Sequence, residues 1–432
     1  MRFGNAQINL AFHSPFTTFA RSCNNLHEKV EDIRMLKGKK ILLGISGGIA
    51  AYKTPELVRL LVKQGADVKV VATRNALQFV TAFTLEILTH HKVYVDMFTG
   101  PAEYHTEHIS LAEWADCFLV APATANTLAK MANGVADDAL STTYLACKCP
   151  VIVAPAMNEN MLDHPATQTN IATLENRGVR VMGTNEGELA CGVTGKGRMP
   201  EPIEILQQVI EYLTPKTLKG KRVLITTGPT YEKIDPVRFI GNFSTGKMGC
   251  ALAETCARRG AEVTLIAGPM KQIVSSSIKR IDVTSAEEMY QAAITEFSQQ
   301  DVAILTAAVA DFTPEHTADV KIKREKDDLN ITLKPTKDIA ASLGQMKSSR
   351  QIMVGFALET NQEQENATRK LERKKLDFIV LNSLNDKGAG FGYDTNKITI
   401  IDRNSQQEFP LKTKQQVAED IINHLETILQ DK

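Results

Sequence analysis

The first half of the chain alternates short apolar runs with amphipathic segments. The apolar runs end at turn residues, a pattern typical of buried parallel strands, and they lie at 41–45, 68–72, 115–120 and 151–154. Amphipathic periodicity predicts helices at 50–64 and 202–213. Strands that alternate with helices imply a parallel sheet with right-handed crossovers, so this half is predicted to be an α/β domain.

The second half repeats this pattern after a short polar linker at 214–217. Strands are predicted at 223–227, 263–267, 302–306, 353–357 and 378–381, with an edge strand at 397–401. Helices are predicted at 247–259, 361–375 and 417–429. The sequence therefore predicts two Rossmann-like α/β domains with mainly parallel sheets, at 36–216 and 217–432.

Residues 1–35 fit neither domain. The stretch from Arg2 to Arg21 holds no acidic residue and several Ser, Thr and Phe, which resembles an organellar transit peptide. Its two arginines are few for such a peptide. A disordered extension is the favoured interpretation.

Charge and cysteine content narrow the possible partners. Lys plus Arg and Asp plus Glu both number 50, so the formal net charge is zero, which argues against nucleic acid. No apolar run approaches the roughly 20 residues that a membrane span needs. The odd count of 7 cysteines, mostly in apolar surroundings, indicates reduced thiols and a cytoplasmic location.

Both halves begin with a basic loop, an apolar run and a glycine turn. The turns are Ser46-Gly47-Gly48 and Gly228-Pro229-Thr230. Such a turn at the carboxyl end of a parallel strand is where α/β proteins bind nucleotides. The first turn lacks the spacing of a dinucleotide fingerprint and suits one phosphate of a mononucleotide.

A further glycine-rich turn, from Gly241 to Met248, nearly matches a P-loop. A P-loop needs Ser or Thr after its lysine, because that hydroxyl binds magnesium, and here Met248 follows Lys247. The ATPase interpretation therefore fails at its metal. The N–H groups that open the next helix still attract phosphate, and an ordinary helix cap is the alternative.

Several motifs of the second half resemble the phosphopantothenate–cysteine ligase family: 228–230, 235–238, 242–249, 307–311, 321–323, 355–360 and Asn382. The resemblance implies that CTP, with Mg2+, activates a carboxylate as an acyl-cytidylate, which the amine of cysteine then attacks. It implies that the amide of Asn242 holds the acyl-cytidylate and that Lys321 offsets the repulsion between two anions. The implied CTP contacts are Asp311, Lys321, Lys337, Asp338, Ile339, Phe356, Lys370 and Lys374.

Two of these assignments have plain alternatives. Lys370 and Lys374 lie one turn apart on a predicted helix, and from the residues alone a solvated charged face is preferred. The family often has Asn-Pro before the acidic residue, where this chain has Thr336-Lys337, so the role of Lys337 is weakly supported. The sequence identifies no metal ligands.

Three segments of the first half, 121–127, 155–161 and 190–199, resemble the homo-oligomeric flavin-containing cysteine decarboxylases. Phosphopantothenoylcysteine decarboxylase is the nearest member. The resemblance implies FMN contacts from Ser46, Gly47, Gly48, Thr73 and Thr124, and catalytic roles for His108, Asn158 and Cys191. In that family FMN oxidises the cysteinyl end of the substrate, carbon dioxide leaves, and a cysteine supplies a proton as the flavin returns the electrons.

Each of these catalytic residues could instead have an ordinary structural role. His108 begins an amphipathic stretch, where a histidine is usually a satisfied structural residue. Asn158 could cap a helix that begins at Glu159. Cys191 lies among glycines in a loop that could close over a substrate, so it is the strongest single candidate.

The two resemblances cover about residues 36–430 and match one fusion family of coenzyme A biosynthesis, with the decarboxylase first and the ligase second. The ligase would make phosphopantothenoylcysteine, and the decarboxylase would convert it to 4'-phosphopantetheine. The resemblance also implies a homo-oligomer with trimeric decarboxylase contacts and dimeric ligase contacts. Two other functions stay open: a flavin oxidoreductase with a regulatory nucleotide-binding tail, and a nucleotide sensor without catalysis.

Overall fold

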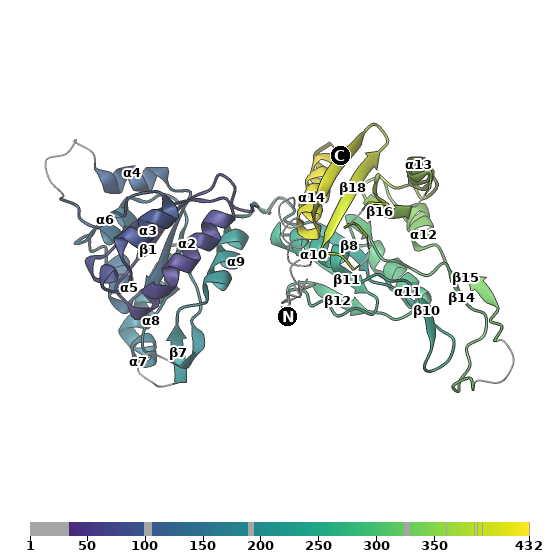
Figure 1. The fold of residues 1–432 in the computed structure, drawn as a ribbon, viewed down its shortest axis with the longest axis horizontal. Coiled ribbons are helices and arrows are strands. Elements are labelled where there is room, and N and C mark those ends of the chain that lie inside the picture. Colours follow the sequence, from purple (N-terminus) through teal and green to yellow (C-terminus); the bar gives the residue numbers. More distant parts are fainter. Residues whose placement is uncertain are drawn as a thin grey trace, which may run out of the picture. The chain divides into compact units, whose positions relative to one another are not determined.

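The computed structural model describes residues 34–431, except 99–105, 189–193, 324–328, 360, 384, 387 and 391. The described residues form two compact units, Arg34–Thr214 and a second that begins at Pro215 (Figure 1). The predicted α/β class with mainly parallel sheets is confirmed. No helix in this described part of the chain is long and apolar enough to cross a membrane.

The first unit is built on a five-stranded parallel sheet. Its order is β2-β1-β3-β4-β5, with bounds Asp67–Ala72, Lys40–Ile45, Cys117–Ala123, Val151–Pro155 and Arg180–Val181. Successive side chains of β1 point to opposite faces. Ile41, Leu43 and Ile45 therefore enter one apolar cluster, and Leu42 enters another on the opposite face.

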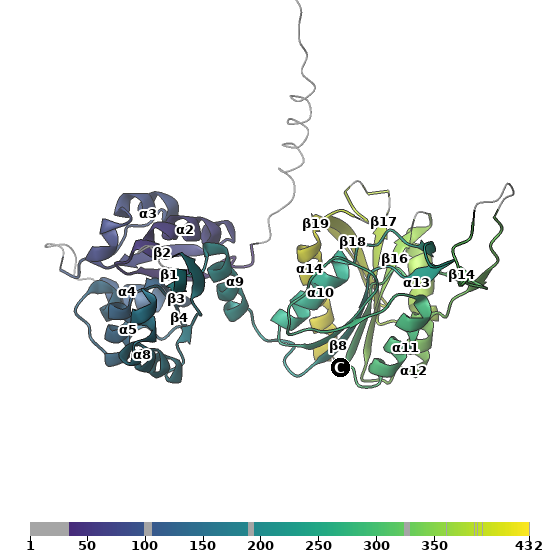
Figure 2. The same cartoon turned by 90° about the horizontal axis from the view of Figure 1, so that it is seen from below.

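Helices cover both faces of this sheet (Figure 2). One cluster includes α2 (Thr54–Lys63) and α9 (Pro202–Leu213), with α3 (Ala82–Thr89) against α2. The other includes α4 (Glu107–Trp114), α5 (Ala125–Asn133), α6 (Ala139–Ala146) and α8 (Pro165–Asn176). The 3-10 segments η1 (Ile49–Lys53) and η2 (Arg74–Gln78) follow β1 and β2, so the predicted helix 50–64 starts as η1 before it becomes α2.

A short antiparallel hairpin lies outside this sheet. Its strands are β6 (Asn185–Glu188) and β7 (Thr194–Arg198), and β7 contacts α7 (Glu159–Asp163). The N–H of Met157 donates to the carbonyl oxygen of Gly197 at 3.0 Å. A side chain at Gly197 would collide with that backbone, and its φ of +116° also favours glycine.

The second unit is built on an eight-stranded sheet in the order β12-β11-β8-β13-β16-β17-β18-β19. The first six strands are parallel: Lys279–Asp282, Glu262–Ala267, Arg222–Thr227, Val302–Leu305, Ile352–Glu359 and Phe378–Ser383. The last two, β18 (Thr395–Asp402) and β19 (Gln406–Thr413), are antiparallel.

The prediction that residues 397–401 form an edge strand is wrong. These residues belong to β18, which pairs with β17 on one side and β19 on the other. The true edge is β19, whose sequence Gln-Gln-Glu-Phe-Pro-Leu-Lys-Thr is mainly polar and has no buried residue. A polar strand with a proline lacks the apolar pattern that identifies a strand in sequence, although proline is typical of an edge.

Helices also cover both faces of the second sheet (Figure 2). One cluster includes α10 (Lys247–Arg258) and α14 (Lys414–Asp431), and the other includes α11 (Ala286–Phe297), α12 (Ile339–Met346) and α13 (Glu363–Arg373). Two small antiparallel pairs complete the unit: β9 (Tyr231–Lys233) with β10 (Phe239–Gly241), and β14 (Phe312–Pro314) with β15 (Leu333–Pro335).

Gly249 allows the first turn of α10 to lie directly against the sheet. A Cβ at Gly249 would lie closer than 3.0 Å to side-chain atoms of Thr227, at the end of β8, and to Thr306 Oγ1. We expect Gly249→Ala to lower the free energy of unfolding by about 1–3 kcal/mol, because extra volume in a packed site forces a shift. Urea unfolding followed by circular dichroism measures this change.

Gly183→Ala is the control, because a Cβ there would meet nothing within 4 Å. Its unfolding midpoint should match that of the unchanged chain. Equal stability of Gly249→Ala and Gly183→Ala would show that α10 does not need the close approach.

Candidate functional site

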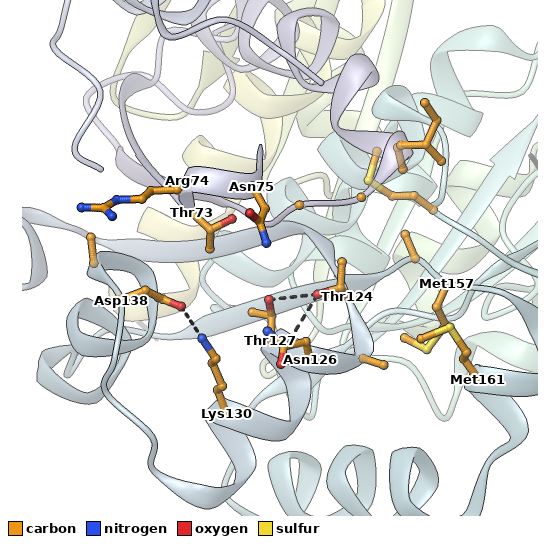
Figure 3. A pocket seen from close by; sticks show the side chains of 18 of the residues that line it. Thr73, Arg74, Asn75, Thr124, Asn126, Thr127, Lys130, Asp138, Met157 and Met161 are labelled. Atoms are coloured by element: carbon orange, nitrogen blue, oxygen red, sulfur yellow. Dashed lines mark hydrogen bonds and ion pairs between the residues drawn. The ribbon is translucent and has the colours of Figure 1, made fainter. Parts of the chain in front are cut away.

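A cavity of about 1250 Å3 lies where β1 and β3 end in the first unit (Figure 3). It is lined by the turn after β1 (Gly47, Gly48), the start of η2 (Thr73, Arg74, Asn75), the start of α5 (Thr124, Asn126, Thr127) and the start of α7 (Met157, Asn158, Met161). The strand order 2-1-3-4-5 reverses direction between β1 and β3. Such switch points are the usual ligand sites of open α/β sheets.

A buried hydroxyl joins the two loops that frame this cavity. Ser46 Oγ donates to the carbonyl oxygen of Pro122 at 2.7 Å and accepts from the N–H of Thr124 at 3.0 Å. Ser46 is 1% exposed and does not line the cavity itself. Its hydroxyl therefore fixes the turn from behind, while the neighbouring Gly47 and Gly48 face the cavity.

Gly47 is required by a close approach of the next loop. A Cβ at Gly47 would lie closer than 3.0 Å to both the side chain and the backbone of Asn75. The turn after β1 therefore lies directly against the start of η2. Thr73 begins η2 as its N-cap, with its hydroxyl accepting from the N–H of Ala76 at 3.3 Å.

The predicted flavin residues Gly47, Gly48, Thr73 and Thr124 come together in this cavity. Thr124 is the N-cap of α5, where its hydroxyl accepts from the N–H of Thr127 at 3.3 Å. In Figure 3 the side chains of Thr73 and Asn75 lie on one side of the cavity, and those of Thr124 and Thr127 lie on the other. Helix starts on both sides supply N–H groups and hydroxyls for an anion.

Sequence reasoning missed Lys130, which lines this cavity. Lys130 Nζ lies 2.7 Å from Asp137 and 2.8 Å from Asp138 (Figure 3). Burial raises the pKa of Asp138, but hydrogen bonds from Lys130 and Ser141 outweigh it, so the net pKa is lowered. Lys130 falls three to four residues after Asn126 and Thr127 on one helix, a spacing that could have identified it.

The three predicted catalytic residues of the first half have different positions. Asn158 lines the cavity and also caps α7, since its Oδ1 accepts from the N–H of Asn160 at 2.9 Å. The position of Asn158 therefore fits both a contact with a ligand and a helix cap. His108 is half-buried on α4 and does not line the cavity, and Cys191 lies outside the described residues.

A second cavity, of about 540 Å3, lies at the carboxyl ends of β8, β13, β16 and β17. The strand order again reverses at a switch point, here between β8 and β13. The predicted nucleotide residues that line it are Asp311, Lys337, Asp338, Ile339, Phe356, Lys370 and Lys374. Seven of the eight predicted CTP contacts thus come together, from four separate segments of the chain.

Ion pairs hold the cations of this second cavity. Asp338 caps α12 by accepting from the N–H of Ala341 at 3.0 Å, and it pairs with Lys374 at 3.0 Å. Lys370 Nζ lies 2.6 Å from Glu359 Oε1. Burial raises the pKa of Asp338, yet the Ala341 N–H and Lys374 outweigh it and lower the pKa overall.

Lys337 points elsewhere, toward α11. Its ammonium lies 2.7 Å from Glu287 Oε1 and 4.7 Å from the centre of the Tyr290 ring. The hydrogen bond to Glu287 raises the pKa of Lys337. Only part of this residue therefore faces the cavity that it lines.

Asn242 and Lys321 are not among the residues that line the second cavity. Asn242 Nδ2 donates to the carbonyl oxygens of Ala308 at 3.0 Å and Val309 at 3.2 Å. Lys321 is exposed, and the next residue, Ile322, is held by Asp235 and Arg238. The backbone of Ala308 and Val309 connects Asn242 to the cavity wall, whereas Lys321 stands apart from it.

The near P-loop differs from a P-loop in its lysine as well as in Met248. Gly246 precedes α10 with φ +75°, and no side chain caps the helix there. Lys247 Nζ lies 2.6 Å from Asp394 Oδ1, a carboxylate that follows β17. Ser244, Thr245 and Gly246 nevertheless line the cavity.

Comparison with known proteins gives the family. Residues 29–214 match the model of the flavoprotein family, and residues 218–429 match that of the DNA/pantothenate metabolism flavoprotein C-terminal domain. The coenzyme A biosynthesis bifunctional protein CoaBC of Vibrio vulnificus is 44% identical over 399 residues, or 92% of this chain and 100% of the relative. This chain belongs to the family of coenzyme A biosynthesis bifunctional proteins. The resemblance inferred from its motifs is confirmed.

CoaBC of Bacillus subtilis is also similar to this chain. It is 45% identical over 396 residues, or 90% of this chain and 97% of the relative. A protein named cysteine/cysteine sulfinic acid decarboxylase, from an unknown prokaryotic organism, is 53% identical over 357 residues, or 81% of this chain and 99% of the relative. A solved C-terminal domain of CoaBC is 41% identical and covers 50% of this chain and 100% of its own, with a TM-score of 0.43.

Asp338 offers a test of how the second cavity is held together. We expect Asp338→Ala to lower the free energy of unfolding by about 1 kcal/mol, because α12 loses its cap and Lys374 loses its partner. Since the pKa of Asp338 is lowered in the folded state, its contribution is full above the unfolded value of about 3.8. The contribution should fade as the pH falls through the folded value.

Urea unfolding at about pH 7 and about pH 3 measures the difference between the two chains. Asp338→Asn is the matched control, because its amide oxygen can still cap α12 but cannot pair with Lys374 as a charge. A stability difference that does not shrink at low pH would contradict the ionic contribution.

Proposed function

We propose that this chain catalyses two consecutive steps of coenzyme A biosynthesis. The second unit ligates cysteine to 4'-phosphopantothenate with CTP through an acyl-cytidylate, and the first unit decarboxylates phosphopantothenoylcysteine to 4'-phosphopantetheine with FMN. The observation that carries this proposal is the presence of one cavity at the switch point of each sheet. The lining of each cavity includes residues of the motifs by which its half of the chain resembles one of the two enzyme families.

The first cavity fits FMN by its shape and donors. A single turn, Gly47-Gly48, suits one phosphate, and the tight approach of Asn75 leaves no room for a larger residue at Gly47. The 2-1-3-4-5 strand order places a mononucleotide at this switch point in other α/β flavoproteins. FMN supplies the electron acceptor that the oxidation of a cysteinyl carbon–sulfur group needs.

The residues of the chain supply binding and proton transfer around it. Gly47 and Gly48 offer N–H groups to the phosphate, with Thr73 and Thr124 beside them. Asn158 holds the departing carboxylate through its amide, and Cys191 donates a proton to the product. His108 is the remaining catalytic residue of the proposal. It lies on α4, whose residues do not line the first cavity.

The second cavity fits the activation of a carboxylate by a triphosphate. Two anions must approach each other there, and Lys370 and Lys374 are already held at the cavity wall by Glu359 and Asp338. Asp311, Ile339 and Phe356 receive the nucleoside, and Asn242 and Lys321 act at the acyl group. We propose that Mg2+ enters with CTP, because Mg2+ prefers oxygen ligands and commonly binds substrate phosphates.

The proposal includes a cytoplasmic homo-oligomer with trimeric decarboxylase and dimeric ligase contacts. Large apolar side chains are exposed on η1 and α3 of the first unit, Tyr52, Phe83 and Ile87. Others are exposed on the small strands of the second unit, Phe239, Phe312 and Leu333. Such groups of exposed apolar residues suit subunit contacts.

A second candidate concerns the substrate of the first unit. The relative named cysteine/cysteine sulfinic acid decarboxylase shares 53% of its aligned residues with this chain, more than the CoaBC relatives above share. Release of carbon dioxide from phosphopantothenoylcysteine, cysteine and cysteine sulfinate, measured side by side, separates the two candidates. Activity on phosphopantothenoylcysteine alone would remove the second.

The full proposal is tested by a coupled assay on the purified chain. We expect pyrophosphate release that needs CTP, 4'-phosphopantothenate and cysteine together, followed by carbon dioxide release and 4'-phosphopantetheine. Supplying ATP in a parallel reaction tests the preference for CTP. Decarboxylation without any ligation would support a regulatory nucleotide-binding tail, and neither activity would support a sensor.

Gly47→Ala tests the flavin turn alone. The added methyl must displace Asn75, so we expect FMN content to fall at least tenfold, a loss of about 1.4 kcal/mol in binding. Absorbance of the released flavin measures this, and CTP-dependent ligation should stay unchanged. Gly183→Ala is the matched control. Full FMN content in Gly47→Ala would contradict the assignment.

A further inference from the structure

Two residues that line the second cavity have a buried amide oxygen without a hydrogen-bond partner. Asn396, on β18, is 1% exposed, and its Oδ1 has no partner among the described residues. Asn382, on β17, is half-buried, and its Oδ1 is also buried without a partner among the described residues. Both residues line the cavity. A buried polar atom without a partner is costly, so an atom from a ligand is the expected partner.

Ordinary strand alternation turns Asn396 toward the buried face of β18. Asn396, Ile398 and Ile400 are buried at alternate positions of this strand. The following residue, Lys397, does not line the cavity and instead pairs with Asp386 at 3.0 Å. Neighbouring positions on one strand thus have different surroundings.

Two ammonium groups lie near these amides. Lys414, at the start of α14, is 8% exposed and donates to the carbonyl oxygens of Gly390 at 3.1 Å and Tyr393 at 2.5 Å. Lys247, at the start of α10, pairs with Asp394 at 2.6 Å. Both lysines line the cavity. The carboxylate of Asp394 is 86% exposed, so it compensates only part of the two positive charges.

Charge is the reason for expecting an anion there. Burial lowers the pKa of Lys414, the positive charge of Lys247 lowers it further, and Asp394 only partly opposes them. A bound anion would relieve both the desolvation and the repulsion. The uncapped N-terminus of α10 adds N–H groups directed at the same cavity.

We propose that Lys247, Lys414 and Asn396 form an anion subsite that binds a phosphate group of one of the two ligase substrates. The subsite uses cations separate from Lys370 and Lys374, and this inference rests on the proposed ligase function. The ligand is a phosphate monoester or polyphosphate with a hydroxyl or N–H group near its phosphate. That group donates to Asn396, and the ammonium groups bind the phosphate oxygens.

Asn396→Leu is the sharpest variant. Leucine has nearly the same shape as asparagine, and the amide oxygen that it removes has no partner, so thermal unfolding should be unchanged. We expect the KM of one substrate to rise about tenfold or more in Asn396→Leu and in Lys414→Met, because a hydrogen bond within a charged site is lost. Lys397→Met is the matched control and should leave both KM values unchanged.

The substrate affected identifies the source of the phosphate. A raised KM for 4'-phosphopantothenate with unchanged CTP assigns its monoester to the subsite, and the reverse result assigns the polyphosphate of CTP. Unchanged KM values for both substrates in Asn396→Leu and Lys414→Met, with an active parent chain, would overturn the subsite.

Calorimetry with inorganic pyrophosphate and with inorganic phosphate separates this inference from the proposed function. If the parent chain performs no ligation, the proposed function fails, but the subsite is still tested by these probes. Binding by the full chain that weakens about tenfold in Lys414→Met, whose ammonium group binds phosphate oxygens, and not in Lys397→Met, supports the subsite. Absent binding, or equal binding in the parent chain, Lys414→Met and Lys397→Met, without ligation, would overturn it.

Discussion

The reversal of strand order beside the first strand of each sheet determines where the two cavities lie. In each unit the crossovers on the two sides of the first strand run in opposite directions, so β1 and β3, and β8 and β13, end beside each other. No single helix can cover both ends, and the N–H groups of the following turns remain available to a ligand. The buried hydroxyl of Ser46, which joins the loops after β1 and β3, shows how closely such a point is packed.

Ion pairs then orient the charged groups at these points before any ligand binds. Lys130 is held by Asp137 and Asp138, and Lys374 is held by Asp338. Partly buried pairs of this kind contribute little net stability, because desolvation offsets much of the attraction. Their value lies in orientation, since an ammonium group that is already positioned loses less freedom when a phosphate arrives.

The sequence misses two parallel strands, β5, which has two residues, and β12, which is mainly polar. It predicts the other nine parallel strands of the two described sheets, because each is an apolar run between turns, and it predicts the helix 202–213 at its observed bounds, α9. Its start is marked by Glu201, Pro202 and Glu204, which form a capping box with proline at the first position. The sequence does not predict β19, which is mainly polar and has no buried residue. Nor does it reveal the charged partners of Lys130 and Lys374, since ion pairs between elements depend on packing.

The near P-loop shows why a local motif can mislead about chemistry. In a P-loop the lysine after the last glycine reaches the phosphates, and here Lys247 occupies that place in sequence but pairs with Asp394, 147 residues away. Met248 packs against the apolar cluster between α10 and the sheet, and it also lines the second cavity. The turn keeps its open N–H groups and loses the P-loop's magnesium hydroxyl, so its chemistry depends on Asn396 and Lys414, which lie far away in the sequence.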